Sequence, residues 1–554
     1  MSSITATAQA RVGLLGNPSD IYGGRGLGFS VAGLTATVQL APAAASTRPN
    51  ELFEAAWTVM ERELRAAGCD PLDRPYELTF ASDIPYQGGL SGSSALVIAA
   101  LRAWARWFGA PLAARRIAAL ALEVENEVLG IRAGPLDRVV QAHDGLLSMD
   151  FARPFEPGAA RRLDGALLPP MLLAWHGKPG ESSGDVHAPV YARFESGDEI
   201  VVQTMQELAE NADAGRDALV RGDAAQFRAC VDHNFELRAR VFPIADADQS
   251  LVELGRAAGA ACKLPGSGGC VLMVCRDPDH LEQVERACRE AGRETLRPRV
   301  APPAPQLRAV FLAAGFATRL YPLTERQAKP LLEVAGAPML TRIVAQVART
   351  GAVVDGVVIS NGKFHSDFEA WSRAPRAPLP LTIVNDGAMT NETRLGAIRD
   401  LALALEEMPS ADGIDGYLVM ACDNLFDFDL AQLVDRYRVA STGQLIVRKV
   451  PNPVPPGRYS EVLLDGDRVV RFREKPQQPE SDLSAIAVYV LPKELPQLVE
   501  SYLDDGSNPD APGHFLAWLS ARLPLEATPL TGRWLDIGSV EDLEKAQSAF
   551  DGDA

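Results

Sequence analysis

Long apolar segments and an excess of positive charge are both missing from this sequence. It contains no run of about 18 apolar residues, the length that a membrane-spanning helix needs, and its first residues, MSSITATAQARVGLLGNPSD, lack the basic start and apolar core of a signal peptide. The formal net charge of −18 argues against nucleic acid or an anionic membrane surface as a partner. An anionic small molecule would therefore have to be bound by local Arg, Lys, Mg²⁺ and backbone N–H groups.

Paired cysteines are missing as well. The seven cysteines form no CxxC pair and follow no regular spacing, which is typical of scattered thiols in a reducing compartment. We therefore expect a cytoplasmic protein. With 554 residues, of which 47% are hydrophobic and 23% charged, the chain has a globular composition and is long enough for three or four domains.

Proline is concentrated at one place. Four prolines fall between Pro298 and Pro305, in and just before the segment APPAPQ, and this density predicts a spacer. The following run, LRAVFLAA, reads as an apolar strand that leads into a glycine turn. A weaker boundary lies near residues 151–165. The predicted organisation is a first unit over 1–300 with lobes of about 1–155 and 156–300, a linker over 301–306, and a second unit over 307–554.

The first unit contains the glycine-rich loop DIPYQGGLSGSSA between a strand, YELTFAS, and a helix, ALVIAALRAWARWF. Glycines let backbone N–H groups approach phosphate oxygens, and the N-terminus of the following helix favours negative charge. Ser93 and Ser94 could bind a phosphate or Mg²⁺ through their hydroxyls. A serine-capped glycine turn with only a structural function would give the same string.

Three further segments of this unit carry polar residues beside glycines. RVGLLGNPSDIYGGRGLG reads as a strand that ends in a turn exposing Asn17, Asp20 and Arg25. LEVENEVLGIRAGPLD places Glu125 on a helix and Asp137 just after a Gly-Pro turn, where a helix cap would also lie. KLPGSGGCV forms a third glycine loop.

These segments carry a resemblance to a known family. PYQGGLSGSSA resembles the nucleotide loop of the GHMP small-molecule kinases, GIRAGPLD the segment with their catalytic aspartate, and LPGSGGCV their third motif. Within that superfamily, GNPSD, GIRAGPLDRVVQ and SSGDVHAPVYARFESGD are most similar to glucuronokinase, over about residues 11 to 275. The resemblance implies a two-lobed GHMP kinase fold and ATP-dependent phosphorylation of the anomeric hydroxyl of a sugar, with D-glucuronate as the expected substrate.

The resemblance also implies roles for individual residues. Asp137 would orient or deprotonate the sugar hydroxyl, and Ser94 and Glu125 would hold Mg²⁺. The residues expected to bind ATP are Gly88, Gly89, Leu90, Ser91, Gly92, Ser93 and Ser94. The residues expected to contact the sugar are Asn17, Asp20, Arg25, His187, Gly266, Ser267 and Gly268.

Arginine is the expected partner of a uronate carboxylate because its planar fork binds both oxygens. Arg25 faces the sugar in this interpretation, and Arg132 or Arg193 could serve equally. His143 and His233 lack the spacing of metal ligands and are expected to be structural or surface residues.

The second unit opens with LAAGFATRLYPLTERQAKPLLEV, which resembles the nucleoside-triphosphate loop of the sugar-1-phosphate nucleotidyltransferases through Gly315, Thr318-Arg319 and Lys329-Pro330. Phe316 and Ala317 stand where many members have glycines, so we expect a stiffer loop with Phe316 lining the nucleotide pocket. NDGAMTNETRLGAI, ACDNLF, REKP and WLDIGS match further motifs in order, up to about residue 545. The implied fold is a doubly wound α/β domain, which makes the whole chain α/β and α+β.

In the implied reaction, an oxygen of a sugar 1-phosphate attacks the α-phosphorus of a nucleoside triphosphate and pyrophosphate leaves. Arg319 and Lys329 would stabilise the transition state, and Asp423 and Asp536 would hold Mg²⁺. Taken singly, each carboxylate could equally be a strand-end turn or a helix cap. The residues expected to bind the triphosphate are Ala313, Ala314, Gly315, Thr318, Arg319, Lys329, Asn385, Arg394 and Gly396. Glu474 and Lys475 are expected to bind the sugar phosphate.

The two halves together predict one pathway. A sugar 1-kinase makes the nucleophile that a nucleotidyltransferase needs, so the partners expected are a small sugar, ATP and a second nucleoside triphosphate, UTP, with Mg²⁺ at both sites. Other sugars, such as galactose, arabinose or galacturonate, or another triphosphate would preserve the phosphate-binding residues. A second unit that only senses sugar nucleotides, or a cytidylyltransferase acting on a phosphorylated alcohol, are further alternatives. The sequence leaves the oligomeric state open.

Overall fold

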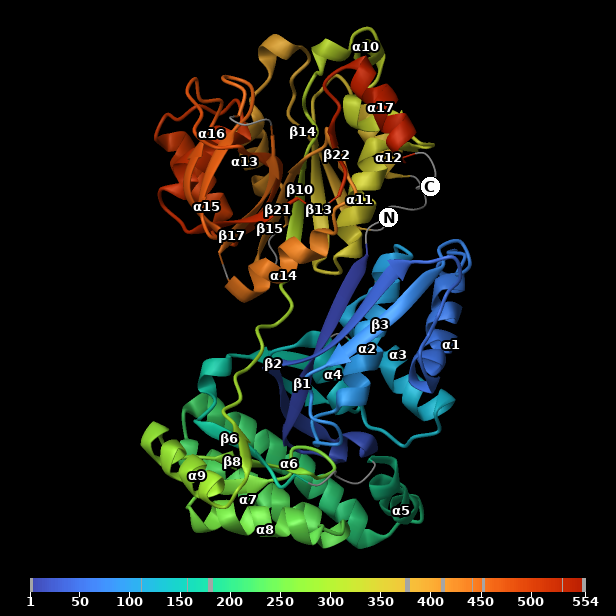
Figure 1. The fold of residues 1–554 in the computed structure, drawn as a ribbon, viewed down its shortest axis with the longest axis vertical. Coiled ribbons are helices and arrows are strands. Elements are labelled where there is room, and N and C mark those ends of the chain that lie inside the picture. The colour runs from blue at the N-terminus through green and yellow to red at the C-terminus, as the bar shows by residue number, and fades with distance from the viewer. Residues whose placement is uncertain are drawn as a thin grey trace. The chain divides into compact units, whose positions relative to one another are not determined.

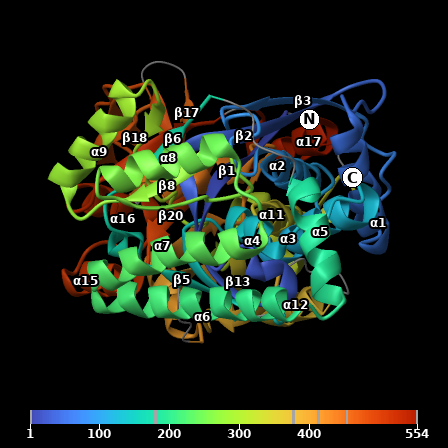
Figure 2. The same cartoon turned by 90° about the horizontal axis from the view of Figure 1, so that it is seen from below.

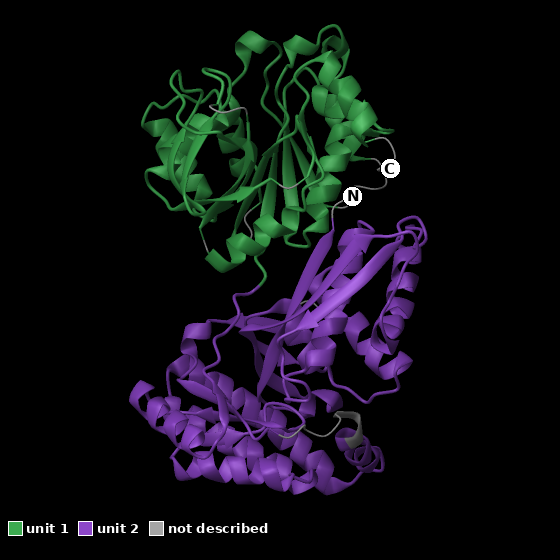
Figure 3. Ribbon diagram, in the orientation of Figure 1, with its two compact units in different colours: residues 1–2, 304–554 green, residues 3–303 purple. Residues whose placement is uncertain are grey.

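The structure is a computed structural model that describes residues 3–110, 112–156, 158–177, 183–373, 379–409, 414–440, 442–450, 454–530 and 532–550, without the side chains of 183–185. Contacts divide the chain into two compact units, residues 3–303 and 304–554 (Figure 3). Among the described helices, none is long and apolar enough to cross a membrane. All seven cysteines are free thiols, and six of them are buried.

The first lobe of the first unit is built on a five-stranded antiparallel sheet (Figure 1). Helix α2 (Gly92–Trp107) packs against both long strands of this sheet and against three other helices, so it is apolar on nearly all sides. The strands are β1 (Ile4–Leu15), β2 (Arg25–Pro42), β3 (Tyr76–Ser82), β4 (Leu146–Asp150) and β5 (Ala160–Leu163), and the other helices are α1 (Glu51–Ala66), α3 (Ala114–Glu123) and α4 (Pro135–His143). Because β5 pairs with β4, this lobe extends beyond residue 155.

The second lobe has a four-stranded antiparallel sheet in the order β7-β8-β6-β9. Figure 2 shows the long helices α6 and α7 side by side, and these two helices pack closely against each other. The strands are β6 (Met171–Trp175), β7 (Ala261–Lys263), β8 (Cys270–Val274) and β9 (Glu294–Leu296), and the helices are α5 (Ser183–Glu195), α6 (Glu199–Arg221), α7 (Ala224–Val241), α8 (Asp246–Ala257) and α9 (Pro278–Glu290).

The second unit contains a nine-stranded mixed sheet in the order β14-β13-β10-β15-β20-β17-β21-β19-β18. Strand β10 (Leu307–Leu312) is parallel to both of its neighbours. Its alternate residues face two separate cores: Phe311 packs with helix α11 (Met339–Arg349), whereas Val310 packs with α13 (Ala397–Glu406). Helices therefore cover both faces of the sheet, and the predicted doubly wound fold is confirmed.

The remaining elements of this unit complete the sheet and its cover. The strands are β11 (Glu333–Val334), β12 (Ala337–Pro338), β13 (Val353–Ser360), β14 (Leu381–Asn385), β15 (Gly416–Ala421), β16 (Asn424–Phe426), β17 (Gly443–Lys449), β18 (Glu461–Asp465), β19 (Arg468–Arg473), β20 (Leu483–Pro492), β21 (Leu525–Pro529) and β22 (Trp534–Asp536). The helices are α10 (Leu323–Arg326), α12 (His365–Ser372), α14 (Leu430–Ala440), α15 (Leu495–Asp504), α16 (Pro512–Ser520) and α17 (Val540–Phe550). Strand order reverses between β10 and β15, the place where open α/β sheets bind ligands.

Candidate active sites

The glycine-rich segments of the first unit meet backbone to backbone. The N–H of Arg11 on β1 donates to the carbonyl of Leu90 at 3.2 Å. Gly89 has a φ of +68°, and a Cβ atom there would lie 2.5 Å from the carbonyl oxygen of Gly268. A Cβ atom at Gly266 would lie 2.3 Å from the carbonyl oxygen of Gly89. Only glycine permits this contact, so the first and third loops form one site.

The residues predicted to bind ATP differ in which of their atoms are accessible to a phosphate. The side chain of Leu90 is buried, so this residue presents only its backbone. Ser93 is exposed in the first turn of α2, whereas Ser94 is buried. Gly88 accepts a hydrogen bond on its carbonyl from the indole N–H of Trp175 at 3.3 Å. The loop therefore presents backbone N–H groups and one exposed hydroxyl at a helix N-terminus, which suits a phosphate.

Asp137 lies in the first turn of α4 and is held by two other segments. Its carboxylate forms an ion pair with Arg11, whose Nη2 donates to Oδ2 at 2.7 Å, and it accepts from the Ser91 hydroxyl at 2.5 Å. Burial alone would raise the pKa of Asp137, but Arg11, Arg138 and Ser91 lower it to about 2. Sequence reasoning missed Arg11, although a charged residue inside the buried half of a strand was a usable signal.

Glu125 and Ser94 form a second buried cluster. The Ser94 hydroxyl donates to Oε1 of Glu125 at 2.9 Å, and Arg138 pairs with the same carboxylate. In the described part of the chain, no group of three or more His, Cys, Asp or Glu side chains could hold a metal by itself. Mg²⁺ is usually bound by one or two protein oxygens together with substrate phosphates, and Ser94 and Glu125 fit that arrangement. Arg138, which follows Asp137 directly, was not foreseen.

Asp20 lies in the 3₁₀ turn Ser19–Tyr22 and approaches the start of α4. Its Oδ2 accepts from the N–H of Leu136 at 3.1 Å, and a Cβ atom at Gly134 would lie 2.0 Å from the same oxygen. Burial and the charge of Asp137 raise the pKa of Asp20 to about 6. Two carboxylates of very different acidity therefore flank the N-terminus of α4.

Other residues predicted to contact the sugar have partners within the protein. Oδ1 of Asn17 accepts from the buried ammonium of Lys263 at 2.6 Å, and Arg25 forms an ion pair with Asp213 at 2.5 Å. These contacts tie the first turn to the third loop and to α6. Lys263 was not predicted, because it precedes the glycine loop inside a short strand.

His187 and the third glycine loop lie near another cation. His187 packs edge-on against Phe242, with ring centroids 5.4 Å apart. Arg238 on α7 donates from Nη2 to the carbonyl of Ser267 at 3.5 Å. Within the matched segment SSGDVHAPVYARFESGD, Ser182 lies outside the described residues. Arg238 was not among the sequence predictions.

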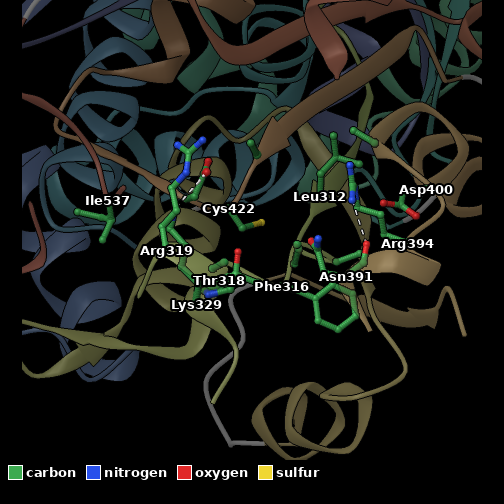
Figure 4. Close-up of a pocket in the computed structure, with 18 of the residues that line it drawn as sticks. Leu312, Phe316, Thr318, Arg319, Lys329, Asn391, Arg394, Asp400, Cys422 and Ile537 are labelled. Atoms are coloured by element: carbon green, nitrogen blue, oxygen red, sulfur yellow. Dashed lines mark hydrogen bonds and ion pairs between the residues drawn. The ribbon is translucent and has the colours of Figure 1, made fainter. Parts of the chain in front are cut away.

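The second unit has a pocket of about 560 Å³ at the ends of β10 and β15. Figure 4 shows Thr318, Arg319 and Lys329 on one side of it and Arg394 and Asp400 on the other. The predicted residues that line it are Ala313, Ala314, Gly315, Thr318, Arg319, Lys329, Arg394, Gly396, Asp423 and Asp536.

The glycine turn of this pocket is open. A Cβ atom at Gly315 would meet nothing within 4 Å, so protein packing does not require glycine there. Phe316 lines the pocket, and Ala317 has a φ of +49°, a left-handed conformation that costs a non-glycine residue about 1 kcal/mol. The turn thus leaves its backbone accessible to a phosphate.

A two-stranded ribbon brings Asp423 and Asp536 together. Strands β16 and β22 pair with Asn424 opposite Asp536, and the N–H of Ile537 donates to the carbonyl of Asp423 at 3.2 Å. Lys329 Nζ lies 3.1 Å from Oδ2 of Asp423. Burial and the charge of Asp423 raise the pKa of Asp536. Two neighbouring carboxylates provide the oxygen ligands that a divalent cation prefers, so this pair fits Mg²⁺.

A smaller pocket of about 200 Å³ adjoins the first. Asp423 and Asp536 line both pockets, and the predicted pair Glu474 and Lys475 lines only the smaller one. It also contains residues that the sequence analysis did not identify. These are Arg448, Arg458, Tyr459 and Trp534, and the guanidinium of Arg448 lies 4.1 Å from the ring centroid of Trp534 and 4.8 Å from that of Tyr459.

Two positions differ from the sequence expectations. Asn385, at the end of β14, does not line either pocket, and its Oδ1 accepts from the N–H of Gly387 at 2.8 Å because the chain turns there. Asp400, not foreseen, lines the larger pocket, and burial together with the charge of Asp386 raises its pKa to about 7.

Comparisons with known proteins find relatives of both units. The family description "GHMP kinases N terminal domain" matches residues 50–145, "GHMP kinases C terminal" matches 216–294, and "Nucleotidyl transferase" matches 308–551. A probable glucuronokinase 2 of Arabidopsis thaliana is 33% identical over 322 residues, which cover 51% of this chain and 87% of that protein. The chain belongs to the GHMP kinases in its first unit, and its second unit matches the nucleotidyl transferase description. The predicted resemblance to both families is confirmed.

The nucleotidyl transferase unit has relatives with different names. The catalytic subunit beta of a mannose-1-phosphate guanylyltransferase of Drosophila pseudoobscura pseudoobscura is 28% identical over 238 residues, 42% of this chain and 60% of that protein. A UTP–glucose-1-phosphate uridylyltransferase of Synechocystis sp. is 24% identical over 247 residues, 43% of this chain and 62% of that protein. The protein is an enzyme that combines a sugar kinase with a nucleotidyltransferase.

Proposed function

We propose that the GHMP kinase unit phosphorylates D-glucuronate at its anomeric hydroxyl with ATP, and that the nucleotidyl transferase unit converts the product and UTP to UDP-glucuronate and pyrophosphate. The kinase relative named as a glucuronokinase supports the first substrate. The product of the first step is a sugar 1-phosphate, the nucleophile that the second step consumes.

In the kinase, Asp137 accepts a hydrogen bond from the anomeric hydroxyl and points its oxygen at the γ-phosphorus. The new O–P bond forms as the bond to ADP breaks, and late in the transfer the hydroxyl proton passes through the Asp137 carboxylate to solvent. Because Arg11 and Ser91 keep the pKa of Asp137 at about 2, this carboxylate is a weak base, and its main effect is positioning. Ser94 and Glu125 would hold Mg²⁺, which neutralises charge on the transferred phosphoryl group.

In the transferase, the sugar phosphate lies in the smaller pocket and the triphosphate in the larger. Lys475 binds the incoming phosphate, and Arg319 and Lys329 stabilise the charge that develops on the α-phosphorus and on the departing pyrophosphate. Asp423 and Asp536 would hold Mg²⁺ where the two pockets meet. Asp423 and Asp536 line both pockets, and this observation supports a catalytic function of the unit over a sensing function.

The choice of UTP is open to a direct test, because the two relatives of this unit are named for guanylyl and uridylyl transfer. Full-length protein is incubated with ATP, one free sugar and one of UTP, GTP, CTP or dTTP, and products are identified by mass. The sugars are D-glucuronate, galacturonate, glucose, galactose and arabinose. We expect UDP-glucuronate only when D-glucuronate, ATP and UTP are all present.

Two results would contradict the proposal. A different nucleotide sugar as the main product would replace the substrate assignment. Failure to convert supplied glucuronate 1-phosphate with any of the four triphosphates would favour a sensing domain.

A further inference from the structure

Arg238 is a buried cation that forms no ion pair with a carboxylate among the described residues. This side chain on α7 is 2% exposed, and its Nη2 donates to the carbonyl of Ser267 at 3.5 Å. Its Nε has no hydrogen-bond partner among the described residues. The nearby carboxylate Asp248 accepts instead from His176 and from the N–H of Gly269. An unpaired buried guanidinium is costly to a fold unless something else satisfies it.

The position of Arg238 connects it to the catalytic aspartate. Its backbone contact, Ser267, follows Gly266, and a Cβ atom at Gly266 would lie 3.1 Å from the guanidinium nitrogens of Arg11. Arg11 is the residue paired with Asp137. Arg238 therefore contacts the same glycine loop that approaches the Arg11–Asp137 pair.

Arg238 and His187 both pack against the aromatic ring of Phe242. The guanidinium of Arg238 is 5.1 Å from the ring centroid of Phe242, and His187 packs edge-on against this ring. Nδ1 of His187 has no hydrogen-bond partner among the described residues. Burial and the charge of Arg238 lower the pKa of His187 to about 3, while the charge of Asp137 opposes this shift. His187 is thus a neutral group within electrostatic reach of both.

The other arginines considered for a uronate are engaged or exposed. Arg25 pairs with Asp213, and Nε of Arg193 lies 2.9 Å from a carboxylate oxygen of Asp198. Arg132 is exposed and lies over the ring of Tyr191 at 3.9 Å. Arg238, in contrast, is buried and forms no ion pair with any carboxylate in the described part of the chain.

We propose that Arg238 binds the carboxylate of the sugar acid, with His187 beside it, and so sets the preference of the kinase for uronates over neutral sugars. The inference rests on the proposed glucuronokinase activity. A carboxylate would give the guanidinium the two-pronged partner that the protein does not supply. A sugar with CH₂OH at that position would leave the buried charge unpaired, which disfavours its binding.

The test measures ADP release by the full-length protein with D-glucuronate, D-glucuronamide and D-glucose. We expect Arg238→Met to lower kcat/KM for D-glucuronate at least about 100-fold, with no loss for D-glucose and no change in the KM for ATP. Arg256→Met is the matched control, because that guanidinium also lies 5.1 Å from a phenylalanine ring, Phe235, but pairs with Asp232 at 3.0 Å. We expect it to keep the preference.

The outcomes separate the two proposals. If the wild-type enzyme prefers D-glucose, the proposed function fails before any variant is made. If it prefers D-glucuronate and a folded Arg238→Met variant keeps that preference, or if only the KM for ATP rises, Arg238 is not the carboxylate receptor. Should Arg238→Met not fold, Arg238→Lys retains the charge without the planar fork. Full retention of preference in Arg238→Lys, or equal use of D-glucuronamide and D-glucuronate by the wild type, would overturn the inference.

Discussion

The kinase and transferase units differ in how the charged side chains of their candidate sites are paired and buried. In the kinase, Asp137 and Glu125 are each paired with an arginine inside the protein. In the transferase, Arg319 is exposed, and Asp423 keeps 43% of its side chain exposed although it contacts Lys329. We therefore expect the kinase site to be largely preorganised by its own residues, and the transferase site to need a cation and a triphosphate to complete its electrostatics.

The largest loss of activity is expected when the Arg11–Asp137 ion pair of the kinase is broken. Asp137→Asn should reduce ATP-dependent phosphorylation of D-glucuronate by about 10³-fold or more, because the hydroxyl loses its orienting carboxylate and Arg11 loses its counter-charge. Conversion of supplied glucuronate 1-phosphate to nucleotide sugar should be unchanged and is the internal control. Near-normal kinase turnover in a folded variant would remove Asp137 from the mechanism.

A smaller but still large loss of activity is expected when Asp423 or Asp536 of the transferase is replaced. Asp423→Asn and Asp536→Asn should each lower pyrophosphate release about 10²-fold, because the metal loses one of two protein carboxylates. The defect should shrink as Mg²⁺ concentration rises. The kinase reaction is the control, since its metal would be held by Ser94 and Glu125. Wild-type turnover of either variant at limiting Mg²⁺ would make that carboxylate structural.

The pH dependence of the two reactions should also differ. The pKa of Asp20 is raised from 3.8 to about 6, so this carboxyl is protonated below that pH and ionised above it. If the ionised form binds the sugar, kcat/KM of the kinase should fall about tenfold per pH unit below pH 6. Asp137 and His187, with pKa values of about 2 and about 3, do not titrate in this range.

Asp20→Asn is the matching variant for that profile. We expect a lower kcat/KM that no longer changes near pH 6, measured against a transferase assay on supplied glucuronate 1-phosphate. An unchanged inflection in Asp20→Asn would assign it to another group.

The smallest effect is expected from separating the units. Residues 3–303 and 304–554 each form a compact unit with its own buried cores, so fragments 1–300 and 307–554 should each fold and keep one activity. Turnover by each fragment, compared with that of the full chain, is the measurement. Two inactive or insoluble fragments would show that the units stabilise each other.

The fold and much of both loops could be predicted because ordered motifs are local. Gly88 to Ser94 and Gly315 to Lys329 carry their chemistry in consecutive residues, and both fold assignments are confirmed. Partners from distant segments could not be predicted in the same way. Arg11 was marked only by its place in the apolar half of a strand, which does not name its partner Asp137. Arg238 looks like an ordinary helix residue until the packing shows what surrounds it.

The carboxylates of the transferase show the same limit. Asp423 and Asp536 lie more than a hundred residues apart in the sequence, and only the hypothesis of a shared metal predicted that they lie close together. In the structure, the pairing of strand β16 with strand β22 brings them together. The predicted boundary region near residues 151–165 contains β5, which joins the first sheet after an intervening turn.

The ribbon of β16 and β22 has a consequence for how the enzyme matures on the ribosome. The kinase unit is complete once residue 303 has been made, whereas the transferase lacks one of its paired carboxylates until β22 and Asp536 have emerged and paired with β16. Since synthesis runs from the N-terminus and domains fold as units, a nascent chain acquires the kinase before the nucleotidyltransferase. A ribosome stalled between these points would display a kinase alone.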